Sequence, residues 1–344
     1  IRGLLENAQD MAKNAAAEND VVDGDNLSGQ VGALMGAMAE DGRDKLTLLL
    51  SPQIVSFGDW VEQLVAESTG KVGKGILPVV GEPVGSPDVY GHDRLFVYIK
   101  LGDDTTYDDT VQELHAAGHP VAVINMKNLV DMGGQFFMWE MATAVAGHIM
   151  GIHPFNQPNV ESAKIQARKM IEEYQQTGKL PELDAALSAD GMTVYGDTSA
   201  DSPGAALKAF VAQGGDGAYI SLHAYIPSTP ESDAALQSLQ KTLRDSTKLA
   251  TTVGYGPRFL HSTGQLHKGD AGNGLFVQFM ADMPQDADIP DAAGDDASGM
   301  RFGTLKIAQS LGDRQALLDE DRHMLRIDLG TDIVAALKKL EAAL

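Results

Sequence analysis

Short apolar runs alternate with segments of helical spacing along most of the chain, and this alternation strongly limits the possible folds. The runs Leu46–Leu50, Leu95–Lys100 and His119–Asn125 are rich in Val, Ile and Leu, and a helical pattern follows each of them. Strands of parallel sheets are buried on both faces and therefore read as nearly continuous apolar runs. We predict an α/β fold in which helices cover both faces of a mainly parallel sheet.

A stretch rich in Gly, Asp and Ser, Gly196–Gly204, interrupts this pattern before the alternation resumes. Such clusters mark loops between periodic segments. We therefore place a domain boundary there and expect domains 1–195 and 196–344. Just before the boundary, Leu180–Val194 predicts a short helix and a strand. In the second domain, Phe302–Leu311 and Asp313–Asp321 predict two successive helices.

Composition excludes several functional classes. The chain contains no Cys, so it has no disulfide, no thiol nucleophile and no cysteine-type zinc site. No apolar run approaches the length that a membrane span requires, and we expect a cytoplasmic protein. The formal net charge of −22 argues against binding to nucleic acids or anionic membranes. A phosphorylated substrate would also be repelled, and would need a local basic pocket supplied by Lys71, Lys74, Lys164, Arg258 and Lys268.

The segment that follows the first apolar run predicts a helix with a polar pair near its end. Ser51-Pro52 is typical of a helix start, and Gly70 is typical of a helix stop. The apolar stripe of this helix consists of Ile54, Phe57, Val61, Leu64 and Val65. Gln63 and Glu67 then lie one turn apart on one face. A carboxylate near a helix C-terminus has a raised proton affinity unless a cation such as Lys71 or Lys74 offsets it, which suits a general base.

Three polar groups of residues stand out against this background: Gln63/Glu67/Lys71, Phe155 to Lys164, and His261 to Lys268. The first is equally consistent with a solvated helix face, and the second with a proline-bounded loop before a surface helix. A carboxylate, a lysine and a histidine together would suit proton transfer next to a carbonyl without any cofactor. No histidine spacing completes a metal site, and the chain lacks GxSxG, HExxH and Walker patterns, so we expect neither a metal nor a cofactor.

These groups carry a family resemblance that extends from about Arg43 to Leu329. The run Glu62–Lys71, EQLVAESTGK, resembles the glutamate motif of phosphoglucose isomerases, and Phe155–Lys164, FNQPNVESAK, looks like their second signature. The run Tyr255–Gly269, YGPRFLHSTGQLHKG, is similar to the isomerase portion of bifunctional transaldolase/phosphoglucose isomerases, as is Phe302–Lys306. The resemblance implies a three-layer α/β sandwich of the sugar-isomerase type.

The resemblance also implies a reaction and the residues that carry it. The reaction interconverts glucose 6-phosphate and fructose 6-phosphate through a cis-enediol, with Glu67 as the base and Gln63 positioning it. Lys164 would be the cation beside the ring oxygen and the developing oxyanion. His261 would open the ring, with His267 as the alternative. We expect the substrate to be bound by Lys71, Gln157, Arg258, Gln265, His267 and Lys268.

One departure from the family concerns the phosphate. Its Ser/Thr cradle precedes the glutamate motif, and nothing before Glu67 resembles that cradle. We therefore expect phosphate binding to reside in a missing N-terminal isomerase segment or another chain, with a transaldolase domain as a further partner. The sequence leaves open a homo-oligomer, a different aldose–ketose isomerase, and a non-catalytic module that binds sugar phosphates.

Overall fold

The computed structural model describes residues 1–283 and 285–344, which form two compact units. Unit 1 consists of Ile1–Pro158 and Gly269–Ala271, and unit 2 of Asn159–Lys268 and Gly272–Leu344. The units divide after Pro158, whereas we predicted a boundary at 195/196. The helix that carries Lys164 therefore belongs to unit 2, and the motif Phe155–Lys164 is divided between the units.

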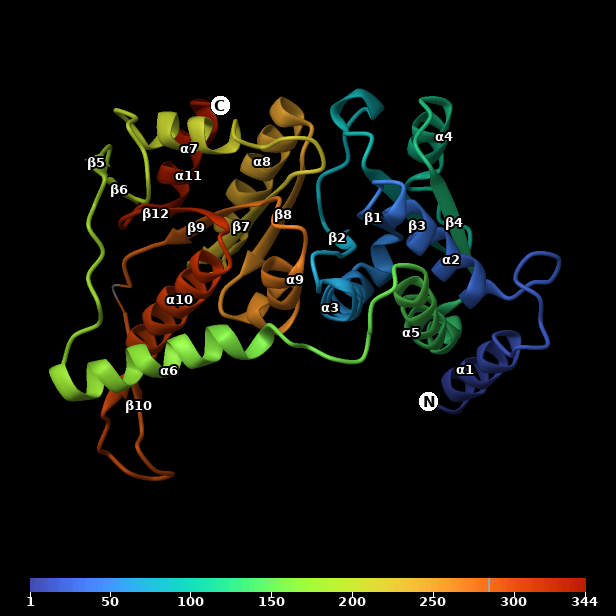
Figure 1. Cartoon of the computed structure of the whole chain (residues 1–344), viewed down its shortest axis with the longest axis horizontal. Helices are drawn as coiled ribbons and strands as arrows, with labels where there is room; N and C mark the ends of the chain where they lie inside the picture. The colour runs from blue at the N-terminus through green and yellow to red at the C-terminus, as the bar shows by residue number, and fades with distance from the viewer. Residues whose placement is uncertain (284) are drawn as a thin grey trace. The chain divides into compact units, whose positions relative to one another are not determined.

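Unit 1 is built on a four-stranded sheet in the order β2-β1-β3-β4, in which every pair is parallel (Figure 1). Its strands are β1 (Lys45–Leu50), β2 (Leu77–Val79), β3 (Arg94–Leu101) and β4 (Val121–Met126). Its helices are α1 (Arg2–Asn14), α2 (Leu27–Glu40), α3 (Phe57–Thr69), α4 (Asp108–Ala116) and α5 (Met132–Ile149). The predicted α/β class with a mainly parallel sheet is confirmed.

Alternate residues of the strands bury themselves against different helices. Leu46, Leu48 and Leu50 belong to one core with residues of α3 and α5. Their neighbour Leu49 belongs to a second core, on the other face of the sheet, with Tyr98 of β3 and residues of α4. This alternation follows from the two-residue period of a strand. Unit 1 therefore has three layers, with a sheet between two layers of helices.

Helix α3 carries the predicted stripe but begins later than predicted. Ile54, Phe57, Val61 and Val65 are buried, and Gly70 is the C-cap as expected. Pro52–Ile54 forms only a short 3-10 turn, and α3 begins at Phe57. The Ser51 hydroxyl donates to Asp104 Oδ2 at 2.5 Å and accepts a hydrogen bond from the Leu101 backbone amide. It therefore links the β1 and β3 loops instead of capping a helix.

Unit 2 contains a mixed six-stranded sheet in the order β5-β6-β12-β9-β7-β8, whose last four strands are parallel. They are β7 (Tyr219–Tyr225), β8 (Ala250–Tyr255), β9 (Gly274–Met280) and β12 (His323–Asp328). The strands β5 (Leu187–Ala189) and β6 (Met192–Tyr195) form an antiparallel hairpin where we predicted a helix and a strand. The reason is the Asp190-Gly191 turn, in which both residues have positive φ, as two-residue hairpin turns require. A short ribbon pairs β10 (Asp288–Ile289) with β11 (Met300–Arg301).

The helices of unit 2 are α6 (Val160–Thr177), α7 (Pro203–Val211), α8 (Pro230–Thr247), α9 (Gly264–Gly269), α10 (Phe302–Asp319) and α11 (Ile333–Ala342). The two helices predicted within 302–321 are one continuous α10, and Gly312 in its middle packs closely against α6. A Cβ at Gly312 would lie 2.6 Å from the backbone nitrogen of Ala167 in α6. Figure 1 shows α6 running along α10.

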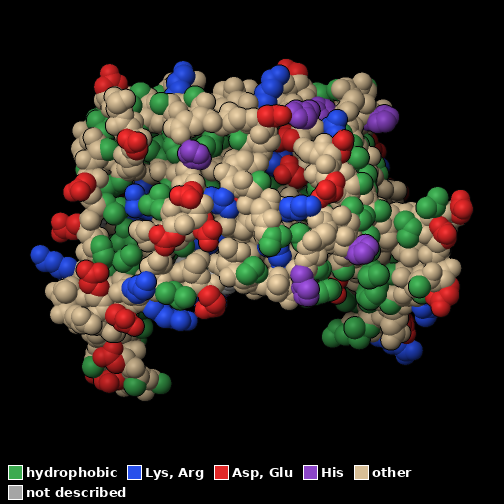
Figure 2. Space-filling model, viewed as in Figure 1, with side chains coloured by type: hydrophobic (Ala, Val, Ile, Leu, Met, Phe, Trp, Pro, Cys, Tyr) green, Lys and Arg blue, Asp and Glu red, His purple; other side chains and the backbone are tan. Residues whose placement is uncertain are grey.

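Within the described residues, 1–283 and 285–344, no helix is both long and apolar enough to cross a bilayer. Acidic side chains are scattered over the face shown in Figure 2 instead of gathering in one patch.

Candidate functional site

The predicted base lies on α3 in unit 1, next to one of its predicted partners. Glu67 is half-buried, and its Oε2 accepts a hydrogen bond of 3.1 Å from the Gln157 side-chain amide. These residues are far apart in sequence and come together because the segment after α5 returns to α3. Gln63 lies one turn earlier on α3 and is exposed. The two motifs that the sequence identified separately, EQLVAES and FNQP, therefore meet at Glu67.

Lys71 holds this segment in place. Its side chain is buried, and Nζ donates to the carbonyl of His153 at 3.1 Å and also to the carbonyl of Asn156. Burial lowers the pKa of Lys71, and the charge of Glu67 counteracts part of that shift. We predicted that Lys71 binds substrate. In the structure its ammonium group holds the loop that brings Gln157 to Glu67, and its role toward substrate stays a prediction. Lys74 forms an ion pair of 2.8 Å with Glu40.

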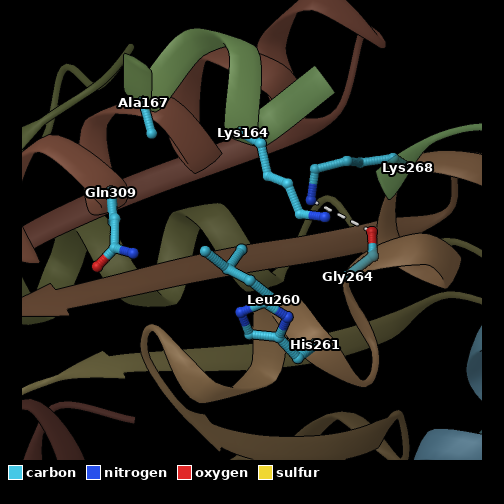
Figure 3. A pocket seen from close by; sticks show the side chains of 7 residues that line it. All are labelled: Lys164, Ala167, Leu260, His261, Gly264, Lys268 and Gln309. Atoms are coloured by element: carbon cyan, nitrogen blue, oxygen red, sulfur yellow. Dashed lines mark hydrogen bonds between the residues drawn. The ribbon is translucent and has the colours of Figure 1, made fainter. Parts of the chain in front are cut away.

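Unit 2 contains a small hollow of about 50 Å³ that is lined by three of the predicted polar residues, Lys164, His261 and Lys268. Figure 3 shows Lys164 descending from α6, His261 approaching from the segment before α9, and the Lys268 side chain bonded to the Gly264 carbonyl. The Lys164 ammonium also pairs with Glu161 at 3.0 Å. Lys164, His261 and Lys268, which are distant in sequence, therefore share one hollow, completed by Ala167, Leu260, Gly264 and Gln309.

Two other predicted binding residues lie elsewhere in unit 2. The Gln265 side chain is buried, and its Oε1 accepts from the Asn159 backbone amide while its Nε2 donates to Asn159 Oδ1, both at 2.9 Å. This pair of bonds fixes the start of α6, the helix that carries Lys164. Arg258 is exposed and is not among the residues that line the hollow.

His267, the alternative ring-opening residue, lies in the interior of unit 2. Its ring stacks on that of His223 with 4.9 Å between centroids, and its Nε2 lies 3.5 Å from Ser221 Oγ. Burial lowers the pKa of His267 well below its usual value, so the ring is neutral near pH 7. His261, by contrast, is exposed at the hollow, where it can exchange protons with a bound molecule. The geometry therefore favours His261 over His267 for acid–base work.

Sequence reasoning missed the buried polar residues behind the hollow. Lys268 forms an ion pair of 2.8 Å with Asp313 of α10, and the second oxygen of Asp313 lies 3.4 Å from His223 Nδ1. All three side chains are almost completely buried. They come from α9, α10 and β7, so no local motif could have joined them. The only sequence signal is a histidine within the apolar run of β7.

No group of three or more His, Cys, Asp or Glu side chains suited to a metal ion occurs among the residues that the structure describes. The candidate groups are therefore a carboxylate with an amide partner in unit 1, and a hollow with two lysines and a histidine in unit 2.

Several glucose-6-phosphate isomerases are similar in sequence to this chain. One from Pediococcus pentosaceus is 26% identical over 226 residues, which are 54% of this chain and 50% of that protein. A probable glucose-6-phosphate isomerase from Methanococcus maripaludis is 27% identical over 214 residues, or 50% of this chain and 46% of that protein. The chain thus spans about half the length of these relatives. No family model matches it.

Among solved structures, a hypothetical protein from Thermus thermophilus is similar over 99% of this chain and 86% of that chain. The sequence identity is 11% and the TM-score is 0.35. A TM-score this low adds nothing to the sheet topology described above.

Proposed function

We propose that this chain carries the proton-transfer groups of an aldose–ketose isomerase of the sugar-isomerase type that interconverts glucose 6-phosphate and fructose 6-phosphate. The observation that carries the proposal is the hydrogen bond between Gln157 and Glu67. It joins two separate motifs that resemble those of phosphoglucose isomerases. The similarity to proteins named glucose-6-phosphate isomerase supports the choice of substrate.

The proposed chemistry requires a carboxylate that is ionised yet able to accept a proton from carbon. Glu67 would take the proton from C2 of the open-chain sugar and return it to C1, and the Gln157 amide orients its oxygen. Gln63, one turn away on α3, would contact the same substrate. A positioned general base of this kind typically contributes a rate factor of about 10²–10⁴.

The other roles belong to unit 2. Lys164 would stabilise the negative charge that develops on oxygen in the enediol, since a fixed cation is most effective where charge appears in the transition state. His261 would donate and accept the proton when the sugar ring opens. Both roles follow the family resemblance, and both residues line one hollow.

The test compares Glu67→Gln with Glu62→Gln in the natural full-length protein. Glu62 lies on the same helix and points away from Glu67 by helical geometry, so it is a matched control for lost charge. We expect isomerisation of glucose 6-phosphate to fall by about 10²–10⁴ in the first variant and to change little in the second. Undiminished turnover in Glu67→Gln would refute the assignment of the base.

Two other functions would give different results with the C2 hydrogen of the sugar phosphate. A non-catalytic module would bind the sugar phosphate without exchanging the C2 hydrogen with solvent. A different aldose–ketose isomerase would exchange that hydrogen faster with another sugar phosphate. The Gln157–Glu67 contact favours catalysis, because a binding module needs no oriented base.

A further inference from the structure

We propose that the hollow in unit 2 binds one oxyanion group, with Lys268 as its fixed cation and Asp313 as the residue that positions Lys268. The proposal deepens the proposed function, since a sugar phosphate ends in such a group, but its test does not depend on turnover. The sequence motifs led us to expect the phosphate cradle outside this chain. The hollow is a candidate within it.

The charged side chains that line the hollow are basic, although the chain has 48 acidic and 26 basic residues. Among the described residues, its lining includes Lys164, Lys268 and His261 and no carboxylate. Each lysine has a carboxylate partner outside the lining, Glu161 for Lys164 and Asp313 for Lys268. The hollow therefore offers an anion the remaining N–H donors of two ammonium groups, with no carboxylate in its wall to repel it.

The size of the hollow limits what it can hold. A cavity needs roughly 10–15 Å³ of space open to the centre of a water-sized sphere to hold one water molecule. At about 50 Å³, the hollow has room for a few water-sized groups, which matches one tetrahedral oxyanion such as phosphate. A whole hexose phosphate would not fit, so only its charged end would enter, and the sugar would lie outside beside the exposed parts of Lys164 and His261.

The Lys268 ammonium group is fixed and retains a donor for a ligand. Its Nζ donates to Asp313 Oδ1 at 2.8 Å and to the Gly264 carbonyl at 3.2 Å. An ammonium group has three N–H donors, so these two bonds leave one for a ligand in the hollow. The backbone is fixed as well, because Arg322 Nη2 donates to the Lys268 carbonyl at 2.7 Å.

Asp313 makes this arrangement possible. A buried ammonium is costly unless an anion accompanies it. Burial raises the pKa of Asp313, but the nearby charge of Lys268 and the contact with His223 outweigh it and hold that pKa well below its usual value. Asp313 therefore stays ionised and gives the Lys268 ammonium a fixed partner at the wall of the hollow. His223 Nδ1, on β7, lies 3.4 Å from the other oxygen of Asp313. Asp313 and His223 are positioning residues and do not line the hollow.

The test titrates inorganic phosphate into the protein and follows binding by calorimetry and by the NMR signals of His261. We expect Lys268→Met to weaken phosphate binding about tenfold or more, since a charged hydrogen bond is lost. The control is Lys306→Met, which removes a half-buried lysine on α10 that does not line the hollow. It should leave the affinity unchanged.

A second variant tests the hollow without removing a charge. Gly264 has ordinary backbone geometry, and a Cβ there would lie 3.8 Å from Lys268 Nζ, an ordinary contact distance. Gly264→Ala should therefore fold normally and weaken phosphate binding by partly filling the hollow. Asp313→Asn should also weaken binding, with the loss shown in the calorimetric affinity of the fraction that remains folded.

Three results would overturn the proposal: no phosphate binding by the parent protein, equal affinity in Lys268→Met, or equal affinity in Gly264→Ala. The failure of the proposed function has a different signature. If Glu67 is not a base, Glu67→Gln leaves turnover intact, whatever the affinity for phosphate. If the hollow is not the oxyanion site, phosphate affinity is unaffected by Lys268→Met while Glu67→Gln still abolishes turnover.

Discussion

Both units place a sheet between helices, but they fill the second face of that sheet differently. In unit 1 the second face combines an apolar cluster that includes Leu49, Phe96 and Tyr98 with a buried ion pair between Arg94 and Glu82 at one end of the strands. In unit 2 the corresponding face carries a row of buried polar side chains. His223, Gln278 and Arg326 occupy neighbouring positions on β7, β9 and β12. The first face of the unit 2 sheet is apolar, as in unit 1.

The polar row connects the sheet to α10. Arg326 Nη1 donates to Gln278 Oε1 at 2.7 Å and to Ser310 Oγ at 3.1 Å, while the Gln278 amide donates to the Ser310 carbonyl. One turn further along α10, Asp313 contacts His223 and Lys268. Hydrogen bonds are directional, whereas apolar packing is not, so this face sets the position of α10 more narrowly. In unit 2, buried hydrogen bonds and ion pairs therefore position the residues around the hollow.

Of the changes considered, removing Asp313 should lower the free energy of unfolding most. Asp313→Ala leaves the Lys268 ammonium buried without its partner, and breaking a buried pair in this way costs about 3–5 kcal/mol of the free energy of unfolding. Urea denaturation measures the loss. The double variant Asp313→Ala/Lys268→Met should recover part of it. A loss below about 1 kcal/mol in the single variant would show that the polar face does not hold unit 2 together.

Gln278→Met should cause the next largest loss in the free energy of unfolding. It keeps the volume of the side chain but removes one of the two acceptors of Arg326 Nη1 and the side-chain donor to the Ser310 carbonyl, at a cost of about 1–3 kcal/mol. The matched change in unit 1 is Tyr98→Phe, which removes the hydrogen bond to Asp104 and should cost about 0.5–1.5 kcal/mol. Urea denaturation measures both variants. Equal losses in the free energy of unfolding would show that the polar contacts of the two faces contribute equally to stability.

Acid should destabilise unit 2 through its two buried histidines. Burial lowers the pKa of both His223 and His267, so the unfolded chain binds protons at a higher pH than the folded chain. The stability that the fold has with both histidines neutral is complete above the unfolded pKa of about 6.5 and is lost as the pH falls below that value. Protonation of each histidine can lower the free energy of unfolding by at most about 1.4 kcal/mol per pH unit.

His267→Gln tests this dependence, because glutamine does not titrate and can still bond to Ser221. Unfolding of this variant, measured between pH 7.5 and 5, should depend less steeply on pH than unfolding of the parent. An unchanged slope would mean that His267 does not titrate on unfolding.

The smallest effect is expected in unit 1, at the Gln157–Glu67 contact. Gln157→Ala removes an exposed hydrogen bond and should change the free energy of unfolding by less than about 0.5 kcal/mol. Turnover should fall at the same time, because Glu67 loses the group that orients it. A large loss of stability in thermal unfolding would instead assign this contact to the fold.

Much of the fold could be predicted from local patterns. The apolar runs located the parallel strands, and the stripe of α3 was correct because it depends only on helical spacing. The hairpin at 187–195 was missed because the Asp-Gly turn signal at Asp190 and Gly191 was overlooked. The helix α10 is continuous through Gly312, where we predicted a break, and the close approach of Gly312 to Ala167 of α6 is a contact that the sequence of α10 does not reveal.

The candidate site was predictable to a lesser degree, for a physical reason. Glu67 and Lys164 belong to linear motifs and were found from them. Asp313 and His223 act through contacts that only the fold creates, since they come from α10 and β7. Lys71 and Gln265 belong to the same motifs as the candidate groups, yet in the structure they fix the loop before α6 and the start of α6. Position in a motif therefore did not predict which of these side chains would be held in internal contacts.

The central claim is that Glu67 moves the C2 proton, and the most direct measurement follows that atom. Glucose 6-phosphate labelled with deuterium at C2 is incubated with the natural full-length protein, and NMR records the loss of the label to water. We expect washout with the parent protein and a rate lower by a factor of about 10² or more with Glu67→Gln. Equal washout rates in the two proteins would contradict the account.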